Sequence, residues 1–208
     1  VSPPDTTSPC HTTGVLNVSC NVSGQTLTDL IEVGEGGSLG NAILTHQLTN
    51  HGWVSNLTIK SQGIINGGII TGIITNEGTL KDFEFRGLSI TGGTLAGTIT
   101  NTSQIGGYFR DVHLAPNTHI KGGKLAGKIR GDHHAPAWLE DMEINAKSQI
   151  EGVIIGEGVQ LPDEISFGTG VRFVRRQDIP TGLDLTQLLP ITKGIDQLTH
   201  VDLSADVV

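Results

Sequence analysis

Three polar residues have the types and the spacing that acid–base catalysis requires. Glu84, His113 and Glu143 occupy equivalent positions in successive repeated segments, so we expect them to form one outward-facing column. Two carboxylates about 5–10 Å apart have a separation in the range found for the catalytic pair of glycosidases. Outward positions of a half-buried strand are polar for solubility alone, however, and these residues fall there automatically. The sequence therefore favours a non-catalytic protein, with Glu84, His113 and Glu143 as the candidates if it is an enzyme.

A loop at residues 131–138 interrupts the repeat and holds the one cluster that resembles metal ligands. It consists of Asp132, His133 and His134, with His113 and His119 one coil earlier. Adjacent histidines reach one ion only with help from the backbone, and this spacing matches no standard zinc pattern. We expect a solvated turn and no cofactor, with a bound metal ion as the alternative. Trp138, at the end of the loop, is expected to cover apolar surface, or alternatively to act as a platform for a sugar.

Several classes of function are disfavoured by composition. The net charge is −8, and Lys and Arg form no run that would follow a phosphate backbone, so nucleic acid is not an expected partner. No stretch of about 18 apolar residues is present, which argues against a membrane span. The sequence also lacks a phosphate-binding loop, a dinucleotide-binding fingerprint and a Gly-x-Ser-x-Gly nucleophile motif.

The elements that position these residues follow from an internal repeat. Four segments align, and they start at Ile65, Ile90, Ile120 and Ile150, which are 25, 30 and 30 residues apart. Apolar residues recur at offsets 0, 5 and 9 in each segment, and a Gly-Gly pair stands at offsets 2 and 3 in the first three. Self-similarity of this kind is typical of a solenoid, in which each repeat stacks on the one before.

A second pattern lies between these segments and reads polar, Asn or Asp, apolar, polar, apolar. This alternation is typical of a strand with one face buried. Its Asn/Asp position is filled by Asn56, Asp82, Asp111 and Asp141. An Asn or Asp side chain just before a strand accepts backbone N–H bonds at a turn. We therefore expect these four residues to form a structural column along one corner of the solenoid.

Both patterns predict an all-β fold, a parallel β-helix or β-solenoid with about 25–30 residues and three short strands in each coil. Gly-Gly pairs and frequent β-branched residues are unfavourable in helices. Columns of Ile, Leu and Val fill the expected interior. We divide the chain into an N-terminal cap with irregular first coils (1–52), regular coils (53–174), and a C-terminal cap or linker (175–208).

Cys10 and Cys20 are the only cysteines, and they lie in a segment rich in Thr, Ser and Pro. We expect them to form a disulfide, which places the protein in the extracellular space, at the cell surface or in the periplasm. Two free thiols in a reducing cytosol are the alternative. Asn-x-Ser/Thr sequons, a weak indication of exposure, start at Asn17, Asn21, Asn56 and Asn101.

From about Trp53 to Val174 the repeat resembles right-handed parallel β-helix proteins. These include the pectin-lyase-like superfamily and the stalks of bacterial surface exoproteins and adhesins. Left-handed β-helices use hexapeptide motifs of about 18 residues per coil, so the longer spacing here favours the right-handed form.

The resemblance to surface exoproteins implies a spacer, a display stalk or an adhesive surface within a larger polypeptide. We therefore expect a structural or adhesive module whose partners are surface glycans or other proteins. The alternative is a polysaccharide-active or carbohydrate-binding β-helix. Against an enzyme of that kind, the sequence has no paired aspartates with the neighbouring Lys or Arg that such sites use.

Overall fold

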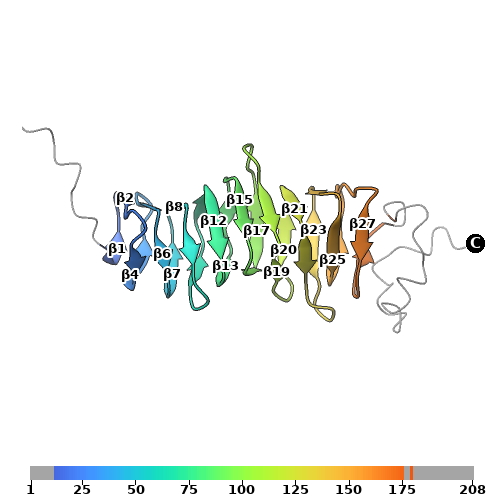
Figure 1. Ribbon diagram of the computed structural model, residues 1–208, viewed down its shortest axis with the longest axis horizontal. Coiled ribbons are helices and arrows are strands. Elements are labelled where there is room, and N and C mark those ends of the chain that lie inside the picture. The colour runs from blue at the N-terminus through green and yellow to red at the C-terminus, as the bar shows by residue number, and fades with distance from the viewer. Residues whose placement is uncertain (1–11, 176–178, 180–208) are drawn as a thin grey trace, which may run out of the picture.

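The computed structural model describes residues 12–175 and residue 179, and every regular element among them is a β-strand. The strands form three parallel sheets, A, B and C, that extend along a rod (Figure 1). The chain passes from sheet A to sheet B to sheet C and back to A, for about nine turns. The predicted all-β parallel solenoid is confirmed.

The strands of each sheet follow one another along the rod. Sheet A contains β1 (Thr13–Leu16), β4 (Asp29–Val33), β7 (Gln47–Asn50), β10 (Ile64–Asn66), β13 (Thr79–Lys81), β16 (Thr94–Ala96), β19 (His113–Leu114), β22 (Lys128–Arg130), β25 (Ser148–Glu151) and β27 (Ile165–Phe167). Sheet B contains β2 (Ser19–Asn21), β5 (Ser38–Gly40), β8 (Trp53–Ser55), β11 (Ile69–Thr71), β14 (Glu84–Phe85), β17 (Thr98–Asn101), β20 (His119–Lys121), β23 (Ala137–Glu140), β26 (Val153–Ile155) and β28 (Arg172–Phe173). Sheet C contains β3 (Thr26–Leu27), β6 (Ile43–Leu44), β9 (Thr58–Ile59), β12 (Ile73–Asn76), β15 (Ser89–Thr91), β18 (Tyr108–Arg110), β21 (Lys124–Ala126) and β24 (Glu143–Ile144).

Each coil is shorter than predicted. Ile65 pairs with Leu80, and Leu80 with Leu95, so these two coils advance by 15 residues each. The coil from Ile129 to Ile150 advances by 21 residues. The predicted coil of 25–30 residues is therefore wrong, although its three strands are confirmed. The preference for a right-handed coil rests on that length, so the observed coils remove its basis.

The sequence repeat misleads because it spans five strands, whereas a coil spans three. The four equivalent isoleucines lie in β10, β15, β20 and β25, which belong to sheets A, C, B and A. Each repeat therefore covers one and two-thirds coils, and equivalent residues appear on successive sheets instead of stacking directly. Their inward direction is confirmed, since Ile65, Ile90, Ile120 and Ile150 are all buried.

The core is one continuous stack of inward side chains, mostly Leu, Ile and Val. Near the middle of the rod the ring of Phe109 packs against Phe83 and Phe85, with centroid separations of 6.3 and 5.3 Å. Burial of each such side chain contributes about 1.5–3 kcal/mol. A slip of one residue would turn these side chains to solvent, so the core fixes which residues of each strand face outward.

The predicted division into caps and regular coils concerns the two ends of the chain. Among the described residues the strand ladder begins at Thr13, within the segment predicted as an N-terminal cap and irregular coils. Cys20 is buried in β2, but Cys10 lies outside the described residues, so their disulfide stays a prediction. Most of the predicted C-terminal cap or linker, 175–208, also lies outside them.

Candidate functional site

The predicted Asn/Asp residues occupy four corners of the solenoid, but these corners are not stacked. Asn56, Asp82, Asp111 and Asp141 follow β8, β13, β18 and β23, which lie in sheets B, A, C and B. Their single column is therefore wrong, again because the repeat spans five strands. All four have positive φ, between 46° and 53°. At three corners the side-chain Oδ1 accepts a backbone N–H at 2.8–2.9 Å, from Ile73, Thr98 and Lys128.

Three buried asparagines have a structural role that the sequence patterns did not predict. Asn50, Asn76 and Asn101 end β7, β12 and β17, and each Oδ1 accepts a backbone N–H two residues further on. Asn101 also donates from Nδ2 to the carbonyl of Gly107 at 2.9 Å. Because Asn101 is only 6% exposed, its sequon does not mark an exposed side chain. Their spacing along the chain follows the sequence repeat, and this spacing was the signal from which they could have been identified.

The candidate catalytic residues do not meet. Glu84 lies in β14 of sheet B, His113 in β19 of sheet A, and Glu143 in β24 of sheet C. The predicted shared column is wrong, because each step of the repeat moves an outward residue to another face of the rod. These three residues therefore do not form an acid–base group.

The loop between β22 and β23 is organised by Asp132. Its Oδ1 accepts the backbone N–H groups of His134 and Ala135 at 2.7 and 2.9 Å. These two hydrogen bonds lower the pKa of Asp132 below its ordinary value, and the bond from His134 has the larger effect. In the part of the chain that the structure describes, no three His, Cys, Asp or Glu side chains are grouped so that they hold a metal ion.

The histidines predicted to join this loop lie in strands beside its two ends, where His113 pairs with Arg130 and His119 with Trp138. His113 and His119 lie in sheets A and B, and Nε2 of His119 is 2.8 Å from Oε1 of Glu140. Trp138 belongs to strand β23 itself and stands between His119 and Ile154 in the ladder of sheet B. Its ring is half-buried, with its centroid 6.4 Å from that of His119.

The feature that the sequence reasoning passed over is Trp53, which faces outward from β8 on sheet B. Its side chain is 40% exposed and forms one wall of a shallow groove of about 590 Å³. The polar side chains of the groove are uncharged: Ser19, Asn21, Ser38, Asn41, Ser55, Asn56 and Thr71. An aromatic residue at an outward position of an alternating strand was the signal in the sequence. This groove is the candidate binding site.

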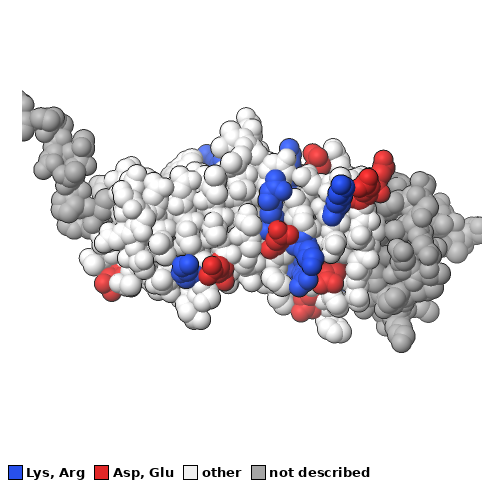
Figure 2. Space-filling view, in the orientation of Figure 1, with Lys and Arg blue, Asp and Glu red and all other residues white. Residues whose placement is uncertain are grey.

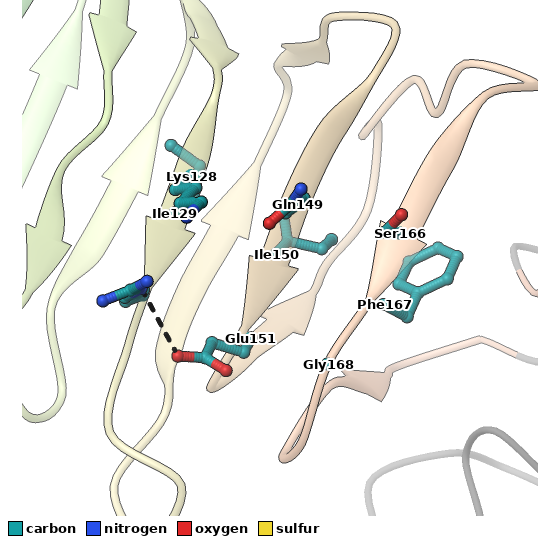
Figure 3. Close-up of a pocket in the computed structure, with 9 residues that line it drawn as sticks. Lys128, Ile129, Gln149, Ile150, Glu151, Ser166, Phe167 and Gly168 are labelled. Atoms are coloured by element: carbon teal, nitrogen blue, oxygen red, sulfur yellow. Dashed lines mark ion pairs between the residues drawn. The ribbon is translucent and has the colours of Figure 1, made fainter.

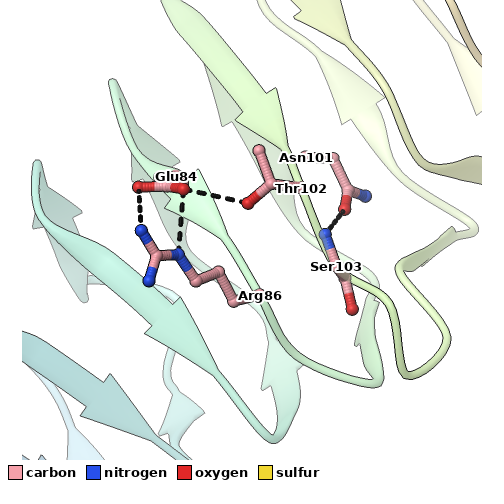
Figure 4. Close-up of polar contacts among 5 residues, drawn as sticks. All are labelled: Glu84, Arg86, Asn101, Thr102 and Ser103. Carbon is pink, nitrogen blue, oxygen red and sulfur yellow. Dashed lines mark hydrogen bonds and ion pairs between the residues drawn. The ribbon is translucent and has the colours of Figure 1, made fainter.

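A polar network further along sheet B supports the indole of Trp53. Arg86 donates to Glu84 through Nε (2.9 Å to Oε1) and Nη2 (3.2 Å to Oε2), and the hydroxyl of Thr102 donates to Oε1 at 2.9 Å (Figure 4). The Arg86 hydrogen bonds, with a smaller contribution from Thr102, lower the pKa of Glu84. Cζ of Arg86 lies over the ring of Trp53, 5.2 Å from its centroid. The guanidinium thus joins the carboxylate to the indole.

Charge is unevenly distributed along the rod. On the face seen in Figure 2, Lys and Arg alternate with Asp and Glu over the C-terminal part, whereas the N-terminal part is largely uncharged. Between residues 12 and 80 the charged residues are Asp29, Glu32, Glu35, Lys60 and Glu77. The groove beside Trp53 belongs to this nearly neutral part.

A second hollow, of about 190 Å³, lies on sheet A across β22, β25 and β27 (Figure 3). Lys128, Gln149 and Ser166 are consecutive in one row of this sheet. Arg130 and Glu151, which pair in neighbouring strands, approach within 3.8 Å and bridge one edge of the hollow. This hollow is small, and its two opposite charges are already paired.

The described residues contain no helix suited to crossing a membrane. No family, curated protein or solved structure matches this chain significantly.

Proposed function

We propose that this chain is a structural or adhesive β-solenoid module of an exported or cell-surface protein, and that it is not an enzyme. The observation that carries the proposal is the rod itself. Sheets A and B each continue through ten strands, over one continuous core. Such a rod keeps its two ends at a fixed separation and presents long, flat faces, as a spacer or an adhesive surface requires.

The arrangement of ionisable side chains supports a non-catalytic role. Glu84, His113 and Glu143 lie on three different sheets. A general acid working near neutral pH needs a carboxyl group whose pKa is raised. The pKa values of Glu84 and Asp132 are shifted in the opposite direction, by hydrogen bonds to their carboxylates. Those hydrogen bonds are typical of structural carboxylates.

The partners that fit this proposal are surface glycans or other proteins. Outward side chains are polar along most of the strands, and the exposed large apolar ones are spread over several coils. A surface of this kind favours contacts through hydrogen bonds and a few aromatic rings over extensive apolar docking.

The test combines adhesion and turnover. Microspheres coated with the chain are passed over immobilised polysaccharides and matrix proteins, and their retention under flow is compared with that of albumin-coated microspheres. The same polysaccharides are incubated with the free chain and assayed for new reducing ends and unsaturated products. We expect selective retention without turnover. Release of oligosaccharides would overturn the non-catalytic proposal, and retention equal to albumin on every surface would overturn the adhesive one.

A further inference from the structure

We propose that the groove beside Trp53 on sheet B binds neutral carbohydrate, with the indole as the platform on which a sugar ring stacks. The inference deepens the proposed function, on which it rests, by naming the ligand class of the adhesive surface. It is carried by an exposed aromatic ring, a lining of uncharged hydrogen-bonding groups, and a network that holds the ring in place.

The exposure of Trp53 is the first argument. Trp53 pairs with Ser38 on one side and Ile69 on the other, so the indole projects from the flat outer row of sheet B. With 40% of its surface in water, it leaves a large apolar area uncovered. A pyranose ring has one face of C–H groups and a rim of hydroxyls, which suits an apolar ring beside polar groups.

The lining polar groups are the second argument. Within residues 12–175 and 179, the side chains of Ser38 and Asn41 make no hydrogen bond. Asn21 and Asn56 each accept a backbone N–H through Oδ1, from Ser23 and Ile73, which leaves their NH₂ groups as donors. Hydroxyl groups of a sugar both donate and accept, so a mixture of amides and hydroxyls satisfies them.

The uncharged lining of the groove favours neutral over acidic sugars as ligands. The groove is lined by no Lys, Arg, Asp or Glu side chain among the described residues. Arg86 is the cation that lies over the indole, and its guanidinium is already hydrogen-bonded to the carboxylate of Glu84. A sialic or uronic acid would lose hydration without gaining a free cation. The ligand class is therefore an uncharged glycan.

Pre-organisation is the third argument. The guanidinium of Arg86 lies over the indole and is itself hydrogen-bonded to Glu84, which Thr102 also contacts. A ring held in its binding position loses little conformational freedom when the ligand arrives. The volume of about 590 Å³ falls in the range of ligand sites. Because the groove is shallow, we expect a dissociation constant on the order of 0.1–1 mM for one site, strengthened by multivalent display.

The test uses the whole chain and the intrinsic fluorescence of tryptophan. The sequence has two tryptophans, so the Trp138→Phe variant leaves Trp53 as the sole reporter. Its emission is titrated with neutral oligosaccharides of glucose, galactose and mannose, and with a sialylated and a uronate oligosaccharide as acidic probes. We expect saturable shifts with at least one neutral series and none with the acidic probes.

Variants then locate the site by calorimetric titration with the best neutral oligosaccharide. Trp53→Ala is expected to weaken binding about tenfold or more, since stacking on an aromatic anchor is lost. Ser38→Arg fills the groove without changing the ring and is expected to abolish binding. Ile31→Ala removes an exposed apolar residue (64%) from β4 on sheet A, away from the groove, and is the control, with unchanged binding.

The outcomes separate this inference from the proposed function. Unchanged affinity in both Trp53→Ala and Ser38→Arg would overturn the site, and preference for an acidic probe would overturn the ligand class. If coated microspheres adhere equally with and without Trp53 and no soluble oligosaccharide binds at Trp53, the adhesive function stands and the groove proposal fails. If soluble oligosaccharides bind at Trp53 but coated microspheres do not adhere, the groove stands and the adhesive function fails.

Discussion

The carboxylate of Asp82 accepts a hydrogen bond from the backbone N–H of Thr98, which lies 16 residues further along the chain and in the next coil (Oδ1–N 2.8 Å). Asn56 and Asp111 make the equivalent bond to Ile73 and Lys128. The bond therefore ties successive coils together at their corners. Asp82 has φ of 51°, so its position needs a side chain that tolerates the left-handed region and also accepts a hydrogen bond. Asn and Asp meet both needs.

Replacement of Asp82 by alanine is expected to destabilise the solenoid by about 2 kcal/mol. The change removes the acceptor for Thr98 and places a residue without local hydrogen bonding at positive φ. Asp82→Asn keeps both properties and should stay within about 0.5 kcal/mol of the parent. Urea denaturation followed by circular dichroism measures both variants. Equal destabilisation by Ala and Asn would contradict this account of the corner.

Replacement of Gly97 by alanine is expected to cost more than the same change at Gly24. Both glycines have positive φ, +75° and +84°, so both substitutions carry a backbone penalty of about 1–2 kcal/mol. A Cβ at Gly97 would lie 1.9 Å from Oδ1 of Asp82, whereas nothing lies within 4 Å of one at Gly24. Gly97→Ala must also displace the Asp82 carboxylate and break its bond to Thr98. Comparison of the two denaturation midpoints isolates this steric contribution, and identical midpoints would show that the corner relaxes freely.

Much of the local structure follows from the sequence alone. The alternation around Ile65 and Ile90 correctly identifies inward side chains, and both are buried. The Asn/Asp residues correctly mark corners. These features depend on the period of a strand and on the chemistry of a turn, which neighbouring residues determine.

The assembly of coils does not follow from the same patterns. Ile65 and Ile90 are equivalent in the repeat, yet they lie on sheets A and C, and the direct neighbours of Ile65 are Leu48 and Leu80. The sequence repeat covers five strands, whereas one coil has three, so equivalent residues of successive repeats do not lie above one another. The length of the repeat alone does not reveal how many strands make up a coil. The site was missed for the same reason, because the groove beside Trp53 is assembled from several successive coils.

The ion pair of Glu84 and Arg86 makes a pH-dependent contribution to stability. The pKa of Glu84 is lowered in the folded state from its ordinary value of 4.5, chiefly by the hydrogen bonds of Arg86. A carboxyl group with a lowered folded pKa stabilises the protein above its unfolded pKa, and the contribution is lost as the pH falls through the folded pKa. Because both side chains are partly exposed, the effect is small.

The Glu84→Gln variant tests this contribution. The parent protein should melt at a higher temperature than Glu84→Gln near neutral pH, and the difference should shrink as the pH falls below about 4.5. Differential scanning calorimetry across this range measures it. Glu143→Gln, an exposed glutamate on sheet C, is the control for the general effect of removing one negative charge. A difference that is constant with pH would contradict the role of the Glu84 carboxylate.

Asn101 offers the sharpest test of the buried asparagines. It accepts the N–H of Ser103 at 3.2 Å and donates to the carbonyl of Gly107 at 2.9 Å, so it holds both ends of the loop that follows β17. Asn101→Ala leaves the part-buried N–H of Ser103 without a partner and removes one of the two donors to the Gly107 carbonyl, which still accepts from Lys124, so it is expected to cost about 1–2 kcal/mol. Thr100→Ala, on the outward side of the same strand, should cost about 0.5 kcal/mol or less.

An aspartate at the same position would separate the donor from the acceptor. In Asn101→Asp the ionised carboxylate still accepts from Ser103, but it faces the carbonyl oxygen of Gly107 and has no proton to donate. Burial and this repulsion should raise the folded pKa of the new carboxyl group above its unfolded value of about 3.9. Its protonated form can donate to Gly107, so Asn101→Asp should approach the stability of the parent as the pH falls through the raised folded pKa. Denaturant midpoints for parent and variant at about pH 7 and about pH 4 show whether the difference in stability shrinks towards acid pH. A gap that widens towards acid pH would contradict the assignment of Nδ2 as the donor to Gly107.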